Sequence, residues 1–433
     1  MSDLEPRSEL RPRSELRTRS GASAAKGIAR HGRLRKAGPV GTILAFVAAA
    51  LAVVLVSGAS VGAIAFNGLY SKKTTVSIIG ETEGPPPQIG AIQGGFNILI
   101  VGSDTRAGQG GIGGSEDDDE SVLNDVNMLL HVSQDQTNAV AISFPRDMVV
   151  GIPECEDSDG NTKGYSREPI NVALYYGGAK NGLSCVVQTV QELTGLPIQF
   201  AGLITFQGVI NMSNAIGGVD VCITAPMVDP YVGINLPTPG TWNLLGDQAL
   251  AFLRSRHGVG DGSDLTRISS QQVFLSSLVR KLKSSDTLGD YKKVYNLADA
   301  AIGSMTLSNS LADIPTMVSI ALALKKIPLE RVTFVQYPGT TGNTEAPYTG
   351  KVKPDTYRGD QLMALVAADQ PFVLDAAGDD QGSTVDPNAP APSADPTAAP
   401  VDNSGLPQLS GVRGQTAAQY TCSITQEATG NED

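Results

Sequence analysis

The feature that most constrains this chain is a stretch of 33 residues, from Gly38 to Tyr70, that contains no charged side chain. About 20 apolar residues in a helix are enough to cross the ~30 Å hydrocarbon layer of a bilayer. Ten Lys and Arg residues lie within the first 36 residues. Because basic flanking residues stay in the cytoplasm, the pattern predicts a basic cytoplasmic tail at 1–37, a single-pass transmembrane helix at 38–70 and an extracytoplasmic remainder. A cleaved signal peptide is the alternative, but its apolar segment is normally shorter.

The charge of the remaining chain argues against a nucleic-acid partner. The whole chain has 32 Lys and Arg against 44 Asp and Glu, and the first 36 residues hold 10 of the basic and 4 of the acidic residues. Subtraction leaves 22 basic and 40 acidic residues, a net charge of −18, for everything that follows. Nucleic acids are bound through basic surfaces that neutralise phosphates, so we expect no nucleic acid among the partners.

Composition divides the predicted extracytoplasmic part into four segments. Residues 71–95 are rich in Pro and Gly and predict a stalk. Residues 376–405 are rich in Pro, Ala and Asp and predict a disordered linker, since that composition cannot build a core. The C-terminal tail at 406–433 is too short for a core of its own unless Cys422 ties it down. The folded domain is therefore expected at 96–375.

Within 96–375, apolar runs rich in Val, Ile and Leu alternate with segments of helical spacing. The runs expected to be strands are FNILIVGSD, VNMLLHVS, AVAISFPRDMVV, VDVCI and ALAFLRSR, and the expected helices include GLSCVVQTVQEL, FQGVINMSNAI, ISSQQVFLSSLVRKL and DIPTMVSIALALKKI. This alternation predicts an α/β domain of three layers, α/β/α, with a central, mostly parallel or mixed sheet. Ligands of such domains bind at the carboxyl ends of strands.

Four cysteines, Cys155, Cys185, Cys222 and Cys422, follow the predicted anchor. Export permits disulfides, and an even number of cysteines suits them. Proximity in the sequence favours a bond between Cys155 and Cys185, although three full connectivities remain open. No CxxC spacing supports a zinc site.

Charged residues lie at the borders of four predicted strands. Arg254 and Arg256 are two residues apart, so in an extended strand they share a face. Arg267 and Gln271 are four apart and share a face of a predicted helix, for which Ser263 or Asp264 is a fitting N-cap. The other border residues are Asp104, Arg106, Asp125, Arg146 and Asp147.

Guanidinium groups that converge need an anion between them, and a pyrophosphate has enough oxygens for three or four arginines. The alternative is that each arginine pairs with an acid. Asp104 and Asp125 would repel a pyrophosphate unless a Mg²⁺ ion lay between them, since Mg²⁺ binds one or two carboxylates together with phosphate oxygens. Here the alternative is a simple ion pair with Arg106 or Arg146.

Six motifs between Phe96 and Leu282 together resemble the LytR-CpsA-Psr (LCP) family, and so does the order of basic tail, anchor and exported domain. They are NILIVGSDTR, DVNMLL, ISFPRDMVV, INVALYYGG, GGVDV and LRSRHGVGDGSDLTRISSQQ. The resemblance implies a membrane-bound ligase that moves a glycopolymer from a polyprenyl-pyrophosphate lipid to a peptidoglycan hydroxyl, with Mg²⁺ as cofactor. An Ala-rich anchor and a Pro-Ala-Asp linker are typical of a high-GC actinobacterium, for which arabinogalactan is the expected polymer.

By position, the resemblance implies that two acids bind magnesium and that arginines bind pyrophosphate. The implied magnesium ligands are Asp104 and Asp125, and the implied pyrophosphate ligands are Arg146, Arg254, Arg256, Arg267 and Gln271. Arg106 is a further expected pyrophosphate ligand, and the expected catalytic residues are Asp104, Arg146, Arg254 and Arg256. Pro169 replaces a basic residue that many relatives carry, for which Arg167 or Lys163 could substitute. The insertion between Asp104 and Asp125 is longer than usual. Two other functions fit the same residues: a polyprenyl-pyrophosphate phosphatase, and a membrane-anchored regulatory protein that binds lipid pyrophosphates without turnover.

Overall fold

The structure is a computed structural model that describes residues 68, 73–79, 81, 94–105, 122–284, 291–389 and 402–426. The predicted cytoplasmic tail and, apart from Gly68, the predicted transmembrane helix lie outside these residues, as does Arg106. Among the described residues, no helix is both long and apolar enough to cross a membrane.

The central sheet has eight strands in the order β1-β14-β9-β2-β3-β4-β15-β21. Three neighbouring pairs are parallel, namely β1 with β14, β9 with β2, and β4 with β15, and the other four pairs are antiparallel. The sheet is therefore mixed, as the sequence predicted. Its strands are β1 (Thr74–Val76), β2 (Phe96–Ser103), β3 (Asn124–Val132), β4 (Ala139–Phe144), β9 (Phe200–Ile204), β14 (Met305–Ser308), β15 (Val332–Gln336) and β21 (Gly414–Thr416).

One face of the sheet is covered by α2 (Ala173–Thr194) and α9 (Thr356–Ala367). Leu99 of β2 is fully buried in one apolar cluster with Val187 of α2 and Val366 of α9. Burial of apolar side chains of this size contributes roughly 1.5–3 kcal/mol each, which holds the two helices on the sheet.

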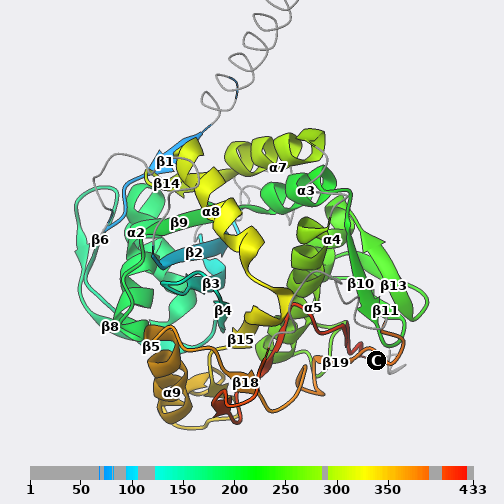
Figure 1. Ribbon diagram of the computed structural model, residues 1–433. Helices are drawn as coiled ribbons and strands as arrows, with labels where there is room; N and C mark the ends of the chain where they lie inside the picture. The colour runs from blue at the N-terminus through cyan, green and yellow to red at the C-terminus, as the bar shows by residue number, and fades with distance from the viewer. Residues whose placement is uncertain are drawn as a thin grey trace, which may run out of the picture. The chain divides into compact units, whose positions relative to one another are not determined.

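The opposite face is covered by α5 (Asp264–Lys283) and α8 (Ile314–Lys326). Ile98, the neighbour of Leu99, points to this face because successive side chains of a strand alternate. It belongs to a second apolar cluster with Ile320 of α8, against which Leu275 of α5 packs. Figure 1 shows α8 lying over the sheet. The three layers confirm the predicted architecture.

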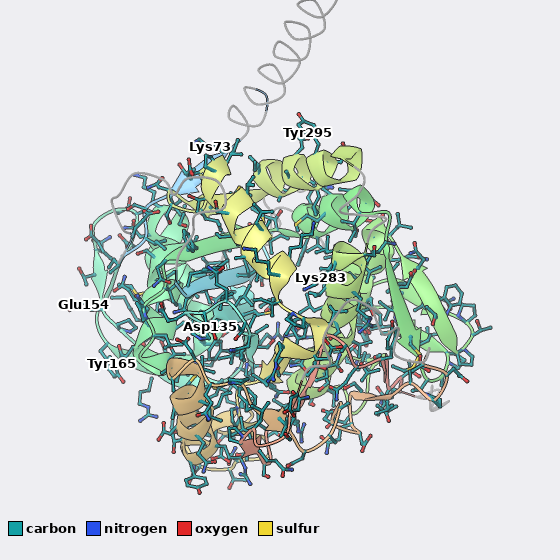
Figure 2. All side chains as sticks on the ribbon, in the orientation of Figure 1. Lys73, Asp135, Glu154, Tyr165, Lys283 and Tyr295 are labelled. Atoms are coloured by element: carbon teal, nitrogen blue, oxygen red, sulfur yellow. A yellow bond between two sulfur atoms is a disulfide. The ribbon has the colours of Figure 1, made fainter. Side chains whose placement is uncertain are left out.

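Lys283, labelled in Figure 2, joins the two helices of this second layer. Its Nζ donates hydrogen bonds to the backbone carbonyls of Leu324, at 3.4 Å, and of Ile327. A cation at the end of α8 complements the negative end of the helix dipole. The last turn of α5 thus fixes the end of α8.

A smaller sheet lies beside the central one, in the order β13-β10-β22-β19. Val221 of this sheet shares a third apolar cluster with Phe252 of α4 and Phe274 of α5. Its strands are β10 (Val219–Ile223), β13 (Gly240–Leu244), β19 (Ser383–Val385) and β22 (Thr421–Ser423). Because α5 contacts both sheets, it forms the common wall between them.

The remaining elements are short strands and connecting helices. The helices are α3 (Phe206–Ala215), α4 (Gly246–Arg254), α7 (Tyr291–Ser304), η2 (Ile170–Val172) and η3 (Leu329–Arg331). The two-stranded ladders join β5 (Val149–Ile152) to β8 (Ser166–Pro169), β6 (Cys155–Glu156) to β7 (Thr162–Lys163), β11 (Met227–Asp229) to β12 (Ile234–Leu236), β16 (Gly339–Thr340) to β17 (Lys353–Pro354), and β18 (Val373–Leu374) to β20 (Gln408–Leu409).

The ends of α3 and α5 follow local sequence signals. Ser263 is the N-cap of α5, and its hydroxyl accepts a hydrogen bond of 3.3 Å from the backbone N–H of Thr266. After α3, Gly217 and Gly218 have φ angles of 75° and 81°, a left-handed conformation that glycine adopts without strain. Both features agree with the sequence.

The run ALAFLRSR is a helix, not the strand that we predicted. It forms most of α4, which ends at Arg254 with Ser255 as C-cap. A short apolar run buried on several sides has no periodicity that separates a helix from a strand, and Ala and Leu favour the helix. Arg254 and Arg256 therefore do not share the face of an extended strand.

Two predicted boundaries also differ from the structure. The stalk segment 71–95 contains β1, which pairs with β14 at one edge of the central sheet. Residues 376–389 and 402–405, expected in a disordered linker, are described, and 383–385 form β19. The C-terminal tail supplies β21 to the central sheet and β22 to the smaller one. Pairing with existing strands lets such short segments fold without a core of their own.

Two disulfides tie these parts together. Cys155 bonds to Cys185, which confirms the predicted pair and joins β6 to α2. Cys222 bonds to Cys422, 200 residues later, and joins β10 to β22. The second bond is the tie to the body that the C-terminal tail requires.

Candidate anion-binding site

Charged residues from three neighbouring strands lie at one edge of the central sheet. β2 and β4 both run antiparallel to β3, so their carboxyl ends meet the amino end of β3. Asp104 follows β2, Asp125 lies at the start of β3 and Arg146 follows β4. Ser103 is paired with Asn124, which places Asp104 and Asp125 at the same end of the ladder. The structure thus brings together three of the strand borders that the sequence singled out.

Asp264, the first residue of α5, is the centre of this cluster. Its Oδ1 lies 2.5 Å from Nη2 of Arg267 and 3.2 Å from Nη2 of Arg256. Its Oδ2 accepts a hydrogen bond of 3.0 Å from the backbone N–H of Arg146, whose Nε lies 4.0 Å from Oδ1. The Asp264 side chain is only 4% exposed. One buried carboxylate therefore brings Arg146, from a distant part of the chain, together with its near neighbours Arg256 and Arg267.

Asp147 links two of these arginines to a lysine. Its Oδ2 lies 3.6 Å from both Nε of Arg146 and Nη2 of Arg256, and its Oδ1 accepts a hydrogen bond of 3.1 Å from Nζ of Lys351. Burial raises the pKa of Asp147, but the bond from Lys351 and the charges of the two arginines outweigh it and lower the pKa overall. Asp147 is therefore ionised at neutral pH.

Asp229 fixes the turn that carries Arg256. Its side chain is fully buried, and its Oδ2 accepts hydrogen bonds from the hydroxyl of Ser255, at 2.8 Å, and from the backbone N–H groups of Arg256 and His257, at 3.1 and 3.0 Å. Hydrogen bonds to an ionised acceptor are stronger than neutral ones. Asp229 thus positions Arg256 without belonging to the ionic cluster itself.

The cluster carries unused hydrogen-bond donors. In the described part of the chain, the Nε–H groups of Arg146, Arg256 and Arg267 are buried and have no hydrogen-bond acceptor. A buried unpaired donor costs about 1–3 kcal/mol, more when it is charged. The pKa of Arg267 is lowered overall, chiefly by burial. The charges of Asp264 and Asp125 raise this pKa, and the nearby positive charges of Arg146 and Arg256 lower it.

The ionic cluster has one positive charge in excess. Its four cations, Arg146, Arg256, Arg267 and Lys351, face three carboxylates, those of Asp125, Asp147 and Asp264. The carboxylate of Asp104, at the same end of the sheet, would balance this excess, so it is the unpaired Nε–H groups that favour a ligand rich in acceptors.

Asp104 and Asp125 offer oxygen ligands at the same edge. Asp125 Oδ1 accepts a hydrogen bond of 2.6 Å from Nη1 of Arg146, so the predicted alternative of an ion pair is present. Asp104 Oδ1 accepts a hydrogen bond of 2.7 Å from the backbone N–H of Leu123. Each carboxylate is partly exposed and has a second oxygen, which fits the preference of Mg²⁺ for one or two carboxylates.

Two other predicted ligands make different contacts. The guanidinium of Arg254 lies over the ring of Phe206, 4.3 Å from its centre. The side-chain amide of Gln271 donates a hydrogen bond of 2.8 Å to the carbonyl of Leu253 and so ties α5 to α4. Their predicted roles toward pyrophosphate stay predictions.

The two proposed substitutes for a basic residue at Pro169 also have partners elsewhere. Lys163 lies over the ring of Tyr176, 4.2 Å from its centre, and Arg167 donates a hydrogen bond of 3.2 Å to the hydroxyl of Tyr348. Lys351 is the lysine that the structure places in the ionic cluster.

Sequence reasoning missed three members of the cluster. Asp264 was considered only as an N-cap, although an acid three residues before Arg267 on a helix is a signal for an ion pair. Asp147 was noted as a strand border but not as a site residue. Lys351 carries no local signal, because it reaches Asp147 through a loop that follows β16.

Comparison with known families shows to which family the chain belongs. The model of the LytR_cpsA_psr family matches residues 68–361, more than half of the chain. The chain belongs to the LytR-CpsA-Psr family. The ionic cluster, from Asp125 to Lys351, and Asp104 beside it lie within the matched residues of this LytR-CpsA-Psr protein.

Its curated relatives include cell-wall proteins. It is 30% identical over 275 residues to the cell wall biosynthesis protein LcpA of Corynebacterium glutamicum, covering 58% of this chain and 51% of the relative. It is 26% identical over 301 residues to the polyisoprenyl-teichoic acid–peptidoglycan teichoic acid transferase TagT of Bacillus subtilis, covering 67% and 85%. The chain thus spans about half the length of the Corynebacterium relative.

Solved structures of the family share the fold. The LytR-Csp2A-Psr enzyme from Actinomyces oris superposes with a TM-score of 0.50 at 20% identity, covering 68% of this chain and 96% of that one. The crystal structure of B. subtilis TagV gives a TM-score of 0.50 at 21% identity, covering 64% and 97%. At this identity, the likeness supports the fold alone.

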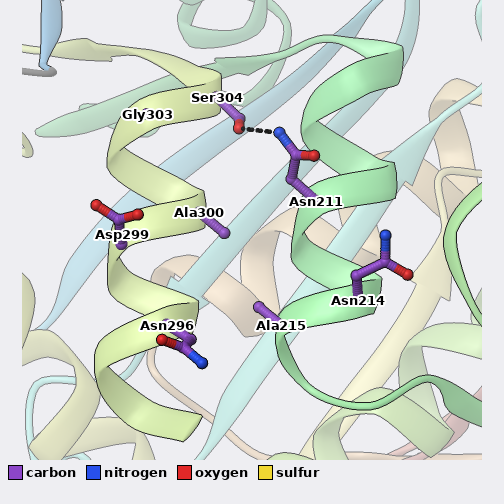
Figure 3. Close-up of a pocket in the computed structure, with 8 residues that line it drawn as sticks. All are labelled: Asn211, Asn214, Ala215, Asn296, Asp299, Ala300, Gly303 and Ser304. Atoms are coloured by element: carbon purple, nitrogen blue, oxygen red, sulfur yellow. Dashed lines mark hydrogen bonds between the residues drawn. The ribbon is translucent and has the colours of Figure 1, made fainter. Parts of the chain in front are cut away.

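A polar hollow lies away from the ionic cluster, between α3 and α7 (Figure 3). Asn211 donates a hydrogen bond of 2.9 Å to the hydroxyl of Ser304 across it. Its lining is Asn211, Asn214, Ala215, Asn296, Asp299, Ala300, Gly303 and Ser304. None of these residues is a member of the ionic cluster.

Proposed function

We propose that this LytR-CpsA-Psr protein binds the pyrophosphate of a polyprenyl-linked glycopolymer and transfers the glycopolymer to a hydroxyl of peptidoglycan. The proposal is carried by the three buried Nε–H groups of Arg146, Arg256 and Arg267, which make no hydrogen bond in the described part of the chain, although Asp147 Oδ2 lies 3.6 Å from the Nε of Arg146. Pyrophosphate oxygens accept planar pairs of hydrogen bonds from guanidinium groups, and one pyrophosphate can serve three arginines.

In the proposed reaction, the acceptor hydroxyl attacks the phosphorus that bears the glycan. The bond from that phosphorus to the bridging oxygen breaks, and polyprenyl phosphate leaves. Negative charge develops on the leaving oxygen, so arginines fixed in advance stabilise the transition state more than the ground state. A nearby carboxylate, Asp104 if it is not committed to the metal, would take the proton of the hydroxyl.

Asp104 and Asp125 are the residues that would hold Mg²⁺. When bound, the ion would neutralise charge on the phosphate oxygens. The protein's own contribution is to keep these two carboxylates at one edge of the sheet, where the ladder between β2 and β3 begins. Arg146, which bonds to Asp125 at 2.6 Å, would then have its guanidinium available for the substrate.

The names of the relatives support the class of substrate. TagT of B. subtilis is named as a transferase of teichoic acid from a polyisoprenyl carrier to peptidoglycan, and LcpA of C. glutamicum as a cell wall biosynthesis protein. The two disulfides, and the anchor predicted at 38–70, suit a domain outside the cytoplasm. Arabinogalactan is the polymer that we propose for an actinobacterial member.

A reconstituted assay tests the proposal. The full chain in detergent is mixed with polyprenyl-pyrophosphate-linked glycan and peptidoglycan, and both glycan on the peptidoglycan and free glycan phosphate are measured. Covalent glycan that disappears in Arg256→Ala, but not in the exposed Arg358→Ala control, supports transfer. Release of free glycan phosphate without attached glycan favours the phosphatase, since water would then have attacked the pyrophosphate, and binding without either product favours the regulatory protein.

A further inference from the structure

Residues 424–426, which follow β22, contact the turn between Arg256 and Arg267. The backbone N–H of Gly260 donates a hydrogen bond of 3.0 Å to the carbonyl of Ile424, and the N–H of Gln426 donates one of 3.1 Å to the carbonyl of Gly258. Val259 and Thr425 form an antiparallel bridge between these bonds. Residues 258–260, which lie between Arg256 and Arg267, are therefore the edge partner of residues 424–426.

The same C-terminal region packs on the first turns of α5. The hydroxyls of Ser423 and Ser270 are hydrogen-bonded at 2.9 Å, and Ile424 donates from its backbone N–H to the carbonyl of Gly382 at 3.0 Å. Gly382 lies so close to α5 that a Cβ atom there would be 2.4 Å from the carbonyl oxygen of Thr266. The helix that carries Arg267 is thus braced at its start.

The braced turn needs external support because of its composition. Gly258, Gly260 and Gly262 lie within five residues, and glycine loses more backbone entropy on ordering than any other residue. Asp229 holds the beginning of the turn at Arg256. The middle of the turn, residues 258–260, is held by the segment that follows Cys422. The sulfur of Cys422 is bonded to Cys222 of β10.

We propose that residues 422–426, locked by the Cys222–Cys422 disulfide, are a positioning element of the pyrophosphate site. This segment lies beyond the residues matched by the family model, which end at 361. It touches no charged group of the cluster and acts by holding the 258–260 turn, so that Arg256 and Arg267 keep their places around Asp264. The inference rests on the proposed function, because it names what positions that site.

The two disulfides provide a matched pair of variants. The Cys222→Ser/Cys422→Ser and Cys155→Ser/Cys185→Ser double variants of the full chain are titrated with farnesyl pyrophosphate by calorimetry. The first should bind about tenfold more weakly than the parent, since a misplaced turn loses hydrogen bonds from the arginines. The second, whose bond lies between β6 and α2, should bind as the parent does. Equal affinity of the first variant and the parent overturns the proposal.

A second pair of variants leaves both disulfides intact. Gln426→Pro removes the N–H that donates to Gly258, whereas Gln426→Ala keeps it. Amide hydrogen exchange of residues 256–264 should become about tenfold faster in the Pro variant only. Unchanged exchange refutes the positioning role even if the disulfide variant does not fold. A parent protein that fails to bind farnesyl pyrophosphate, yet shows this exchange difference, contradicts the proposed function instead.

Discussion

The carboxylate of Asp264 lies 2.5 Å from the guanidinium of Arg267, three residues further along α5, and their side chains are 4% and 6% exposed. A buried ion pair is a weak source of net stability, because both charges have lost their water. Removing one partner is nevertheless costly, because the other charge stays buried. This pair therefore makes the site sensitive to any change in its charge.

Arg267→Met should destabilise the protein by about 3 kcal/mol, because it leaves the carboxylate of Asp264 short of a partner in a buried place. The control is Arg358→Met, which breaks a pair of the same i,i+3 spacing with Asp355 on α9, where the arginine is 46% exposed. That loss should stay within about 0.5 kcal/mol. Urea unfolding measures both, and equal losses would contradict the role of burial.

Asp147→Asn should strengthen pyrophosphate binding by about tenfold, since Arg146 and Arg256 lose a competing carboxylate 3.6 Å away. Lys351→Met should act in the opposite direction, because Asp147 then has only the arginines as partners. Calorimetric titration with farnesyl pyrophosphate measures both. Changes of the same sign in the two variants would show that the carboxylate does not compete with the ligand.

His131 should make stability depend on pH. Its ring nitrogens contact Asn97 Oδ1 at 2.9 Å and Asp369 Oδ1 at 3.0 Å. Burial lowers the pKa of His131, and the charge of Asp369 offsets this only in part.

The folded protein thus binds fewer protons than the unfolded chain just below the unfolded pKa of about 6.5. The free energy of unfolding should therefore rise as the pH passes from the lowered pKa of the folded state to the pKa of the unfolded chain. The contribution of His131 should be fully present above the unfolded pKa. His131→Gln should flatten this slope in urea titrations from pH 5 to 7.5, while the exposed His257→Gln should keep it.

Gly382→Ala should destabilise the protein by about 1–3 kcal/mol, because the new methyl group meets backbone atoms of Thr266 that cannot move away cheaply. Gly164→Ala is the control, since nothing lies within 4 Å of its Cβ position. Thermal unfolding compares the two variants. Similar midpoints for both would mean that α5 and the C-terminal region are less closely packed than the structure shows.

Asp104→Asn should abolish any gain in farnesyl pyrophosphate affinity that Mg²⁺ gives the parent, because a neutral amide is a poorer ligand for this cation than a carboxylate. Asp220→Asn, an exposed acid bonded to Asn243, should retain the gain. Titrations with and without Mg²⁺ measure it. A parent whose affinity ignores Mg²⁺ would remove the two aspartates from the proposed metal role.

Much of the site's framework was predictable from the sequence because it depends on local signals. Asp104, Asp125 and Arg146 each border an apolar run, and the strand order brings such borders to one edge of a sheet. Ser263 was a predictable N-cap because a serine hydroxyl can accept a hydrogen bond from the backbone N–H three residues later. The sequence also gave the correct partner for Cys155 from proximity alone.

The rest depended on contacts between distant residues. The helix that ends at Arg254 takes its exposed polar residues, Asp247 and Gln248, from before the apolar run, and the run ALAFL alone is too short to separate a helix from a strand. Lys351 reaches Asp147 from a loop more than 200 residues away. Residues 376–405 were expected to be disordered because their composition is poor in apolar residues, yet the described part of this segment includes β19, which pairs with β22.

The 200-residue separation between Cys222 and Cys422 sets an order of events in biogenesis. A nascent polypeptide emerges from its N-terminus, so the aspartates and arginines of the site appear long before the thiol that completes the second bond. Until then, the glycine-rich turn at 258–262 lacks its last support. Full competence toward the lipid headgroup would thus wait until residues 422–426 have been made and the second disulfide has closed.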